Sequence, residues 1–233
     1  MLENVKGAIF DMDGTLVDSL FLWEVIWDKF GELFCDGKKI RPSEQDDKAV
    51  RTMTLADAME YIYQRYKIGK RGAELHKAAD KIMEEFYAEE VQLKDGVVEL
   101  LEYLHKRGTK MCIASATDIR LIKIAAKHCD IDKYFDKIFS CAEIGKGKDE
   151  PDIYIKAMEY LGTTKEETCV FEDSHIAIKT ASLLGVPTVG IYDENNYGQE
   201  EIKKIATVYL DKGESFTKLM KRDVKNDKSS KSI

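Results

Sequence analysis

The sequence predicts an α/β fold, a doubly wound, Rossmann-like parallel sheet with an inserted small α-helical cap domain. Short apolar runs that do not alternate with polar residues are typical of strands covered on both faces, as in a parallel sheet. From about residue 95 to residue 206, helical patterns separate most of these runs. Such an alternation is typical of a doubly wound sheet. Between Ser19 and Asp95 only helical patterns occur, which indicates an insert.

Six apolar runs account for the predicted strands. The four clear runs are Val5–Phe10, Lys110–Ser115, Thr168–Glu172 and Pro187–Ile191, and the two weaker ones are Lys137–Cys141 and Val208–Leu210. Apolar stripes at helical spacing predict the helices between them. One stripe, which contains Val97, Leu101 and Leu104, ends at Gly108. Glycine just after the last periodic residue is a typical helix stop.

The insert defines the predicted domain boundaries. Its roughly 75 residues are too many for a connection inside a compact sheet. Helical patterns fill it at about 19–35, 54–66 and 72–92, and a polar stretch lies at 36–50. We therefore predict a core domain from 1–18 and 95–215, a helical cap domain from 19–94, and a polar C-terminal tail from 216–233.

Composition excludes several classes of protein. The net charge is −7 and there is no dense basic block, which argues against nucleic acid as a partner. The five cysteines are odd in number and show no Cys-x-x-Cys spacing, so neither a disulfide framework nor a zinc site is indicated. No apolar stretch approaches membrane-spanning length, and the first strand begins too early for a signal peptide. We expect a cytoplasmic monomer with no membrane partner.

The most informative residues are two acids at the end of the first apolar run. Asp11 and Asp13 follow Val5–Phe10 and precede a Gly-Thr turn. Burying carboxylates at a sheet edge without a cation or a proton is costly. Mg²⁺ takes oxygen ligands and often uses one or two carboxylates together with a substrate phosphate. The pair therefore predicts Mg²⁺ and phosphate chemistry.

Further acids and hydroxyls end other predicted strands. Ser115 and Thr117 end the second strand, and Glu172 and Asp173 end the fourth. In open α/β sheets, ligands bind in the crevice at the carboxyl ends of the strands, beside helix N-termini that favour anions. These residues are remote in sequence, and the fold is expected to gather them into one site.

Four motifs in this order carry a family resemblance. They are Asp11-Met12-Asp13-Gly14-Thr15-Leu16-Val17-Asp18-Ser19, Ile113–Thr117, Gly147–Tyr154 and Val170–Ser174. On these motifs the chain resembles the haloacid dehalogenase-like (HAD) hydrolase superfamily, in its capped phosphatase and β-phosphoglucomutase-like branch. The resemblance covers the chain to about residue 193 and implies a Mg²⁺-dependent enzyme that acts on a small phosphorylated metabolite.

The resemblance also implies roles for the acids. Asp11 is expected to be the nucleophile that becomes an aspartyl-phosphate, and Asp13 the general acid and base. The Asp11 carboxylate, the Asp13 main-chain carbonyl and Asp173 are expected to hold Mg²⁺, with Glu172 nearby. Asp13 further separates phosphate-ester chemistry from the related dehalogenases and phosphonatases, which lack an acid at this position.

The remaining implied residues bind phosphate and substrate. Ser115, Ala116 and Lys148 are expected to bind the phosphate oxygens; the spacing of Lys148 to Pro151 and Asp152 selects it over Lys146. The candidate residues of the insert for contacting the substrate are Arg51, Trp23 and Lys48.

Three functions stay open at this point. Hydrolysis of a phosphomonoester is the first. A sugar-phosphate mutase with the same core motifs is the second, although Trp23 stands where mutase-like members carry a histidine. The third is a regulatory module that binds a phosphorylated metabolite without turning it over.

Overall fold

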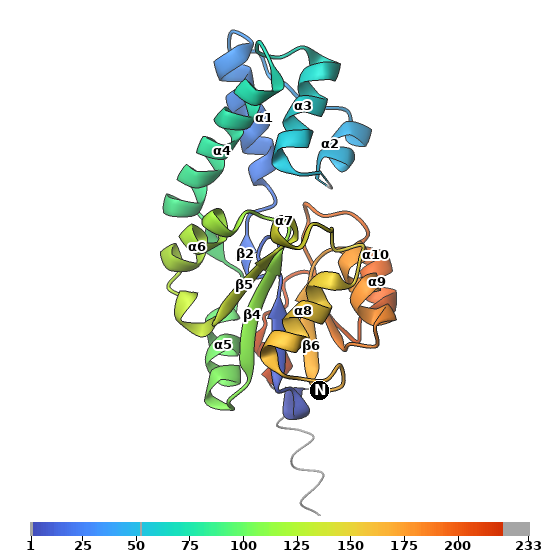
Figure 1. Cartoon of the computed structure of the whole chain (residues 1–233). Helices are drawn as coiled ribbons and strands as arrows, with labels where there is room; N and C mark the ends of the chain where they lie inside the picture. The colour runs from blue at the N-terminus through green and yellow to red at the C-terminus, as the bar shows by residue number, and fades with distance from the viewer. Residues whose placement is uncertain (1, 52, 221–233) are drawn as a thin grey trace, which may run out of the picture. The chain divides into compact units, whose positions relative to one another are not determined.

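The computed structural model describes residues 2–51 and 53–220. Within them the chain divides into two compact units (Figure 1). The larger unit combines the segment up to Leu20 with the segment from Val91 onward, and the smaller unit is Phe21–Glu90. The sequence analysis set the limits of the insert at 19–94.

The larger unit is built on a six-stranded parallel sheet, which confirms the predicted fold class. Its order is β5 (Lys137–Ser140), β4 (Lys110–Ser115), β1 (Gly7–Phe10), β6 (Thr168–Glu172), β7 (Thr188–Ile191) and β8 (Val208–Leu210). From β1 the chain first adds β4 and β5 on one side and then crosses to add β6, β7 and β8 on the other. The order therefore reverses between β1 and β6, and ligands bind at such a switch point.

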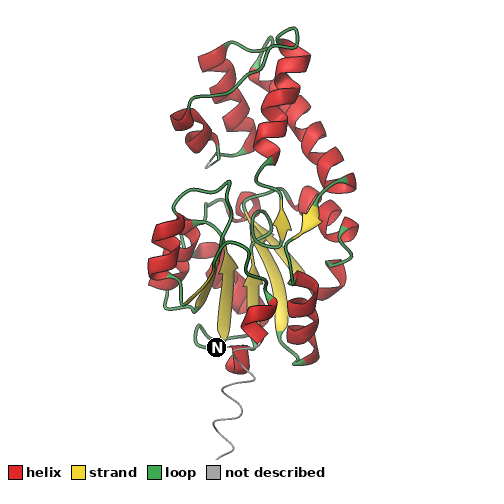
Figure 2. Ribbon diagram, turned by 180° about the vertical axis from the view of Figure 1, so that it is seen from behind, coloured by secondary structure: helices red, strands yellow, loops and turns green. Residues whose placement is uncertain are grey.

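Helices cover both faces of this sheet (Figures 1 and 2). They are α5 (Val97–Lys106), α6 (Ile119–His128), α7 (Cys141–Ile144), α8 (Asp152–Leu161), α9 (His175–Leu183) and α10 (Gln199–Ile205), with short 3₁₀ turns at Leu2–Asn4 and Asp132–Tyr134. Helices α8 and α9 share one apolar core with the strands, in which Ile9, Val170 and Ala157 are buried. At the centre of the sheet, the rings of Phe10 and Phe171 stack with centroids 4.3 Å apart.

A small antiparallel ladder, β2 (Val17–Asp18) with β3 (Gln92–Leu93), lies at the two points where the chain leaves and re-enters the larger unit. In the described part of the smaller unit, helices are the regular secondary structure, and loops connect them. The unit contains α1 (Leu22–Phe34), α2 (Glu44–Val50), α3 (Leu55–Tyr66) and α4 (Gly72–Glu89). Its core is apolar and aromatic, with Trp27, Phe30, Met59, Ile62 and Leu75 all buried.

Two observations qualify the expectations from sequence. Phe216 and Leu219 are buried in the larger unit, so the polar tail does not begin at residue 216 as expected. Both side chains are apolar, and packing removes their surface from water. The rest of the predicted tail, residues 221–233, lies outside the described residues. Among residues 2–51 and 53–220, no helix combines the length and apolar character that crossing a bilayer requires.

Candidate active site

The candidate site lies at the carboxyl ends of β1, β4 and β6, on both sides of the switch point. Asp11 directly follows β1, Ser115 is the last residue of β4, and Glu172 is the last residue of β6. Parallel pairing in register sets β1 between the other two strands. The sheet therefore brings together strand ends that are remote in sequence, since Asp11 lies 104 positions before Ser115 and 161 before Glu172.

Three carboxylates converge there. Asp11, Glu172 and Asp173 each offer an oxygen within 4.8 Å of the others, and all three side chains are buried. Lys148 reaches this cluster from the loop before α8: its Nζ donates to Asp11 Oδ1 and, at 3.0 Å, to Glu172 Oε1. The other Glu172 oxygen accepts the main-chain N–H of Asp173 at 3.0 Å. Lys148 thus pairs with two of the three acids.

Burial is the main influence on the pKa values of the three acids. Burial raises the pKa of Asp173 to about 7, and the nearby Asp11 carboxylate adds to the shift. Burial likewise raises the pKa of Asp11, against the lowering effect of Lys148, and holds the pKa of Glu172 well above its usual range. For Lys148, burial lowers the pKa, but Asp11 and Glu172 outweigh it, so the pKa stands well above its ordinary value.

These residues fit a hard divalent cation. The donor set consists of carboxylate oxygens only, which Mg²⁺ prefers and which soft metals do not. Three carboxylates lie within 4.8 Å of one another, and Lys148 pairs with two of them. An additional positive charge at this cluster would offset the remaining negative charge.

Asp13 stands apart from the carboxylate cluster and is held by two hydroxyl groups. Ser19 Oγ donates to Asp13 Oδ1 and Thr117 Oγ1 donates to Asp13 Oδ2, both at 2.7 Å. The donors come from opposite sides in the sequence, one before the insert and one after β4. Two hydrogen bonds, one to each oxygen, restrict the orientation of the Asp13 carboxylate.

The predicted phosphate-binding segment follows β4. The Ser115 hydroxyl is buried and accepts the main-chain N–H of Thr117 at 3.2 Å, so its own proton points elsewhere. Ala116 is exposed at the turn between this strand and α6. Lys146 lies outside this arrangement, because it forms an exposed pair with Asp152 at 3.1 Å. The choice of Lys148 over Lys146 agrees with these contacts.

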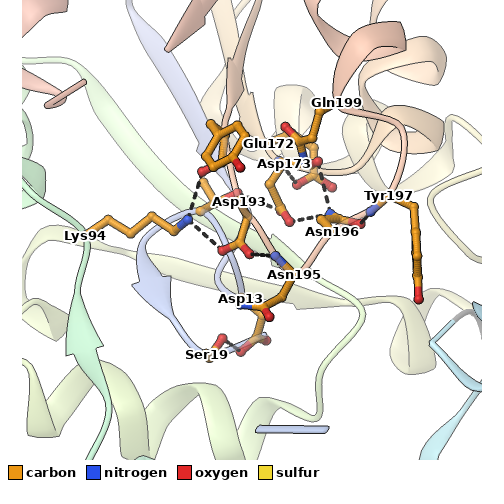
Figure 3. A network of polar contacts seen from close by, with 12 residues as sticks. Asp13, Ser19, Lys94, Glu172, Asp173, Asp193, Asn195, Asn196, Tyr197 and Gln199 are labelled. Atoms are coloured by element: carbon orange, nitrogen blue, oxygen red, sulfur yellow. Dashed lines mark hydrogen bonds and ion pairs between the residues drawn. The ribbon is translucent and has the colours of Figure 1, made fainter. Parts of the chain in front are cut away.

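Backbone and side-chain contacts fix Asp173. Gly14 has φ of +74°, and a Cβ on it would lie 2.8 Å from the Asp173 Cγ, so only glycine fits where the first loop passes this acid. Thr15 Oγ1 donates to Asp173 Oδ1 at 3.0 Å. On the other side, Asn196 Nδ2 donates to Asp173 Oδ2 at 2.6 Å (Figure 3).

The substrate-contact candidates of the insert all belong to the smaller unit. Arg51 Nε pairs with Asp47 at 2.8 Å, and Lys48 forms an exposed pair with Glu44 at 2.7 Å on the same helix. Trp23 is half-buried, and its ring centroid lies 5.7 Å from that of buried Trp27. The Trp27 indole N–H donates to the same Asp47 that holds Arg51, at 3.2 Å. Trp27 is buried and belongs to the core of the smaller unit.

Sequence reasoning placed Thr117 at the site without naming its partner, and it assigned no role in the site to Thr15 or Asn196. Thr117 and Thr15 were visible within quoted motifs, but their roles depend on partners 104 and 158 residues away. Asn196 lies in a polar loop after β7 and carries no motif signal. Asp193, which anchors this loop, did have a signal, because it is an acid just after a buried strand.

Comparisons with known proteins agree with this geometry. The family model described as haloacid dehalogenase-like hydrolase matches residues 8–191. The chain is 24% identical over 218 residues to the phosphorylated carbohydrates phosphatase of Thermotoga maritima, covering 93% of this chain and 99% of that protein. It is 26% identical over 219 residues to the phosphoglycolate phosphatase of Salmonella typhi, covering 85% of each.

A solved structure shows the same fold. The crystal structure of CbbY from Rhodobacter sphaeroides in complex with phosphate has a TM-score of 0.73 to this chain at 20% identity. The alignment covers 88% of this chain and 93% of that one.

Proposed function

The chain belongs to the haloacid dehalogenase-like hydrolases, and we propose that it is a Mg²⁺-dependent phosphatase that hydrolyses a small phosphomonoester through an aspartyl-phosphate. The family and the enzyme class predicted from the four motifs are confirmed. The observation that carries the proposal is the convergence of Asp11, Glu172, Asp173 and Lys148, with a second acid, Asp13, held separately by two hydroxyl groups.

The carboxylate cluster is the proposed Mg²⁺ site. Asp11, Asp173 and the main-chain carbonyl of Asp13 would hold the ion, with Glu172 beside it. Bound there, the ion supplies positive charge that offsets the repulsion between the Asp11 carboxylate and an incoming phosphate. Lys148 adds a fixed positive charge at the same oxygens.

The first half of the proposed reaction breaks the ester. An Asp11 carboxylate oxygen attacks phosphorus, a bond forms between that oxygen and phosphorus, and the bond from phosphorus to the substrate oxygen breaks. Asp13 gives its proton to the departing alcohol. The Ser115 hydroxyl and the Ala116 main chain hold the phosphate oxygens, while Lys148 balances the charge that spreads over them.

The second half of the proposed reaction hydrolyses the aspartyl-phosphate and regenerates the free enzyme. Asp13, now a carboxylate, takes a proton from a water molecule as that water attacks phosphorus. The bond between phosphorus and the Asp11 oxygen breaks, and inorganic phosphate leaves. The hydrogen bonds from Ser19 and Thr117 suit this step, because they hold the Asp13 carboxylate in one orientation while it acts as the base.

Sugar phosphates and similar small phosphorylated metabolites are the proposed substrates. The names of two relatives, a phosphorylated carbohydrates phosphatase and a phosphoglycolate phosphatase, support this class. Arg51, Trp23 and Lys48 are the proposed contacts to the part of the substrate beyond the phosphate. We further propose a cytoplasmic monomer without nucleic-acid or membrane partners.

The test is release of inorganic phosphate from a panel of phosphomonoesters. We expect turnover with Mg²⁺ and none after EDTA. Asp11→Asn is expected to lose at least about 10³-fold in kcat, because the nucleophile is gone. Asp132→Asn, which changes an exposed aspartate of the same unit, is the matched control and is expected to match the wild type.

Each contrary outcome names another function. Full activity of Asp11→Asn would exclude the covalent route. Conversion of a hexose 1-phosphate to its 6-phosphate without release of phosphate would make the chain a mutase. Binding across the panel without any turnover would make it a regulatory module.

A further inference from the structure

The Asp173 carboxylate is held on both of its oxygens by residues outside the metal-ligand set. Thr15 Oγ1 donates to Oδ1 at 3.0 Å, and Asn196 Nδ2 donates to Oδ2 at 2.6 Å. The same Asn196 nitrogen also donates to the main-chain carbonyl of Asp173 at 3.0 Å. Since each carboxylate oxygen has two lone pairs, each keeps one after these contacts. Those remaining lone pairs are available to a cation.

The orientation of the Asn196 amide is fixed chemically. Its Oδ1 accepts the main-chain N–H of Tyr197 at 2.8 Å, while its nitrogen faces two oxygens of Asp173. The reverse orientation would set the amide oxygen against a carboxylate and the amide nitrogen against an N–H. Only the observed orientation satisfies both ends.

A second set of contacts holds the loop that carries Asn196. Asp193 is buried, and its Oδ2 accepts from Lys94 Nζ at 2.7 Å (Figure 3). Lys94 also donates to the carbonyl of Tyr192 at 3.1 Å. The other Asp193 oxygen accepts the N–H of Asn195 at 2.8 Å, and the Asp193 carbonyl accepts the N–H of Asn196 at 3.2 Å. The loop therefore has a fixed path from β7 to Asn196.

The end of the loop is also constrained. Gly198 has φ of +79°, and a Cβ on it would lie 2.7 Å from His175 Nδ1. His175 begins α9, two residues after Asp173. The loop thus packs closely against the first residue of α9, two positions after the acid.

We propose that Asn196 is a positioning residue for the metal site: it sets the plane of the Asp173 carboxylate so that its remaining lone pairs face Asp11. This inference rests on the proposed Mg²⁺ site. Groups that orient metal ligands by hydrogen bonding typically alter metal affinity by about 10- to 100-fold when they are removed. Without Asn196, the Asp173 carboxylate keeps its Thr15 hydrogen bond but loses the one to Oδ2, and the added freedom must be removed whenever the ion binds.

The experiment measures Mg²⁺ binding without substrate. Isothermal titration calorimetry with MgCl₂ alone compares the wild type, Asn196→Ala and Glu194→Gln. Asn196→Ala is expected to raise the Kd for Mg²⁺ about 10- to 100-fold. Glu194 lies in the same loop but makes only an exposed pair with Lys212 at 3.2 Å, so Glu194→Gln is expected to stay within about twofold of the wild type.

Kinetics give a second readout that a merely structural role would not move. In Asn196→Ala, the Mg²⁺ concentration for half-maximal activity is expected to rise with the Kd, and excess Mg²⁺ is expected to restore kcat. Wild-type Mg²⁺ affinity in a folded Asn196→Ala would overturn the inference, as would the absence of Mg²⁺ binding in the wild type.

If Asn196→Ala does not fold, the wild type decides. In ¹⁵N-labelled protein, the side-chain amide resonances of Asn196 are expected to shift on saturation with Mg²⁺, and unchanged resonances would overturn the inference. The outcome is separate from the proposed function. Weaker Mg²⁺ binding in a protein that hydrolyses no phosphomonoester would support the positioning role and reject the phosphatase. Equal Mg²⁺ binding by the wild type and Asn196→Ala, in a protein that does hydrolyse phosphomonoesters, would reject the positioning role and support the phosphatase.

Discussion

Tyr154 carries a polar group for which the site has no evident use. Its side chain is 1% exposed, and its hydroxyl has no hydrogen-bond partner among residues 2–51 and 53–220. The ring packs in the core shared by α8 and the sheet, and burial holds its pKa well above the usual range, with Glu172 and Asp11 adding to the shift and Lys148 opposing it. A buried hydroxyl without a partner costs about 1–3 kcal/mol in desolvation.

We therefore expect Tyr154→Phe to leave the free energy of unfolding unchanged or to raise it by about 1 kcal/mol, because the ring stays and only the unpaired hydroxyl goes. Urea unfolding of the metal-free protein measures this. Tyr160→Phe is the matched control from the same helix, since the Tyr160 side chain is half exposed and its hydroxyl makes a long contact of 3.4 Å. A loss of more than about 1 kcal/mol in Tyr154→Phe would mean that the hydroxyl has a polar partner, such as a bound water.

At this scale, the sequence revealed residues whose chemistry is local. Asp11 and Asp173 were predictable because each follows a buried strand, and Lys148 because of its spacing to a proline and an aspartate. Asn196 was not, because its role depends on the path of a polar loop that Asp193 and Lys94 hold from elsewhere. A hydrogen bond between distant loops leaves no periodic signal in the chain.

Among the elements, α2 shows how a polar segment becomes ordered. The sequence analysis saw only a polar stretch at 36–50, yet α2 forms with Ser43 as its N-cap. Asp46 in its first turn is 2% exposed and gathers several donors. Tyr61 and Tyr66 of α3 donate to it at 2.6 Å each. The helix is thus fixed by tertiary contacts rather than by an apolar stripe, which explains why periodicity did not predict it.

Asp46 also gives this element a pH dependence. Hydrogen bonds from Tyr61 and Tyr66 hold the pKa of Asp46 well below its ordinary value of 3.8. A carboxyl whose pKa is lower in the folded state stabilises the fold above its unfolded pKa, and that stabilisation is lost as the pH falls toward the folded pKa. Asp46→Asn is therefore expected to lower the melting temperature at pH 7, and the difference from the wild type is expected to shrink below about pH 4.

Thermal unfolding followed by circular dichroism from pH 7 to pH 3 measures the effect. Asp57→Asn is a matched control, because Asp57 also lies in the first turn of a helix of the smaller unit but is exposed. A constant difference between wild type and Asp46→Asn across this range would contradict the electrostatic account.

For the whole molecule, the sequence predicted the architecture well because the β-α alternation is repeated many times along the chain. The parallel direction of the six strands was predicted from that alternation, their order comes from the structure, and the long insert was visible as an interruption of the alternation. The end of the apolar packing was less visible. Phe216 and Leu219 are two apolar residues in a polar segment, and only the structure reveals the surface that buries them.

The distribution of charge links the proposed cation to the stability of the larger unit. The chain has a net charge of −7, and within it three buried acids meet one lysine at a sheet edge. Bringing like charges together under burial destabilises the metal-free fold. A ligand that binds only the folded state stabilises it by about 2.7 kcal/mol at a concentration of 100 times its Kd. With the proposed ion bound, the acidic cluster would therefore make the folded protein more stable than it is without metal.

The proposed ion site predicts that Asp173→Asn changes the free energy of unfolding differently in EDTA and in Mg²⁺. Asp173→Asn removes one charge at nearly constant size but loses one of the two hydrogen bonds to the side chain, so in EDTA its free energy of unfolding is expected to stay within about 1 kcal/mol of the wild type. With Mg²⁺ at 100 times the wild-type Kd, the wild type is expected to gain about 2.7 kcal/mol and Asp173→Asn well under half of that. Urea unfolding with and without Mg²⁺ measures both quantities. An equal gain in the two proteins would show that the ion binds outside this cluster, because only a site that includes Asp173 makes the stabilisation depend on its charge.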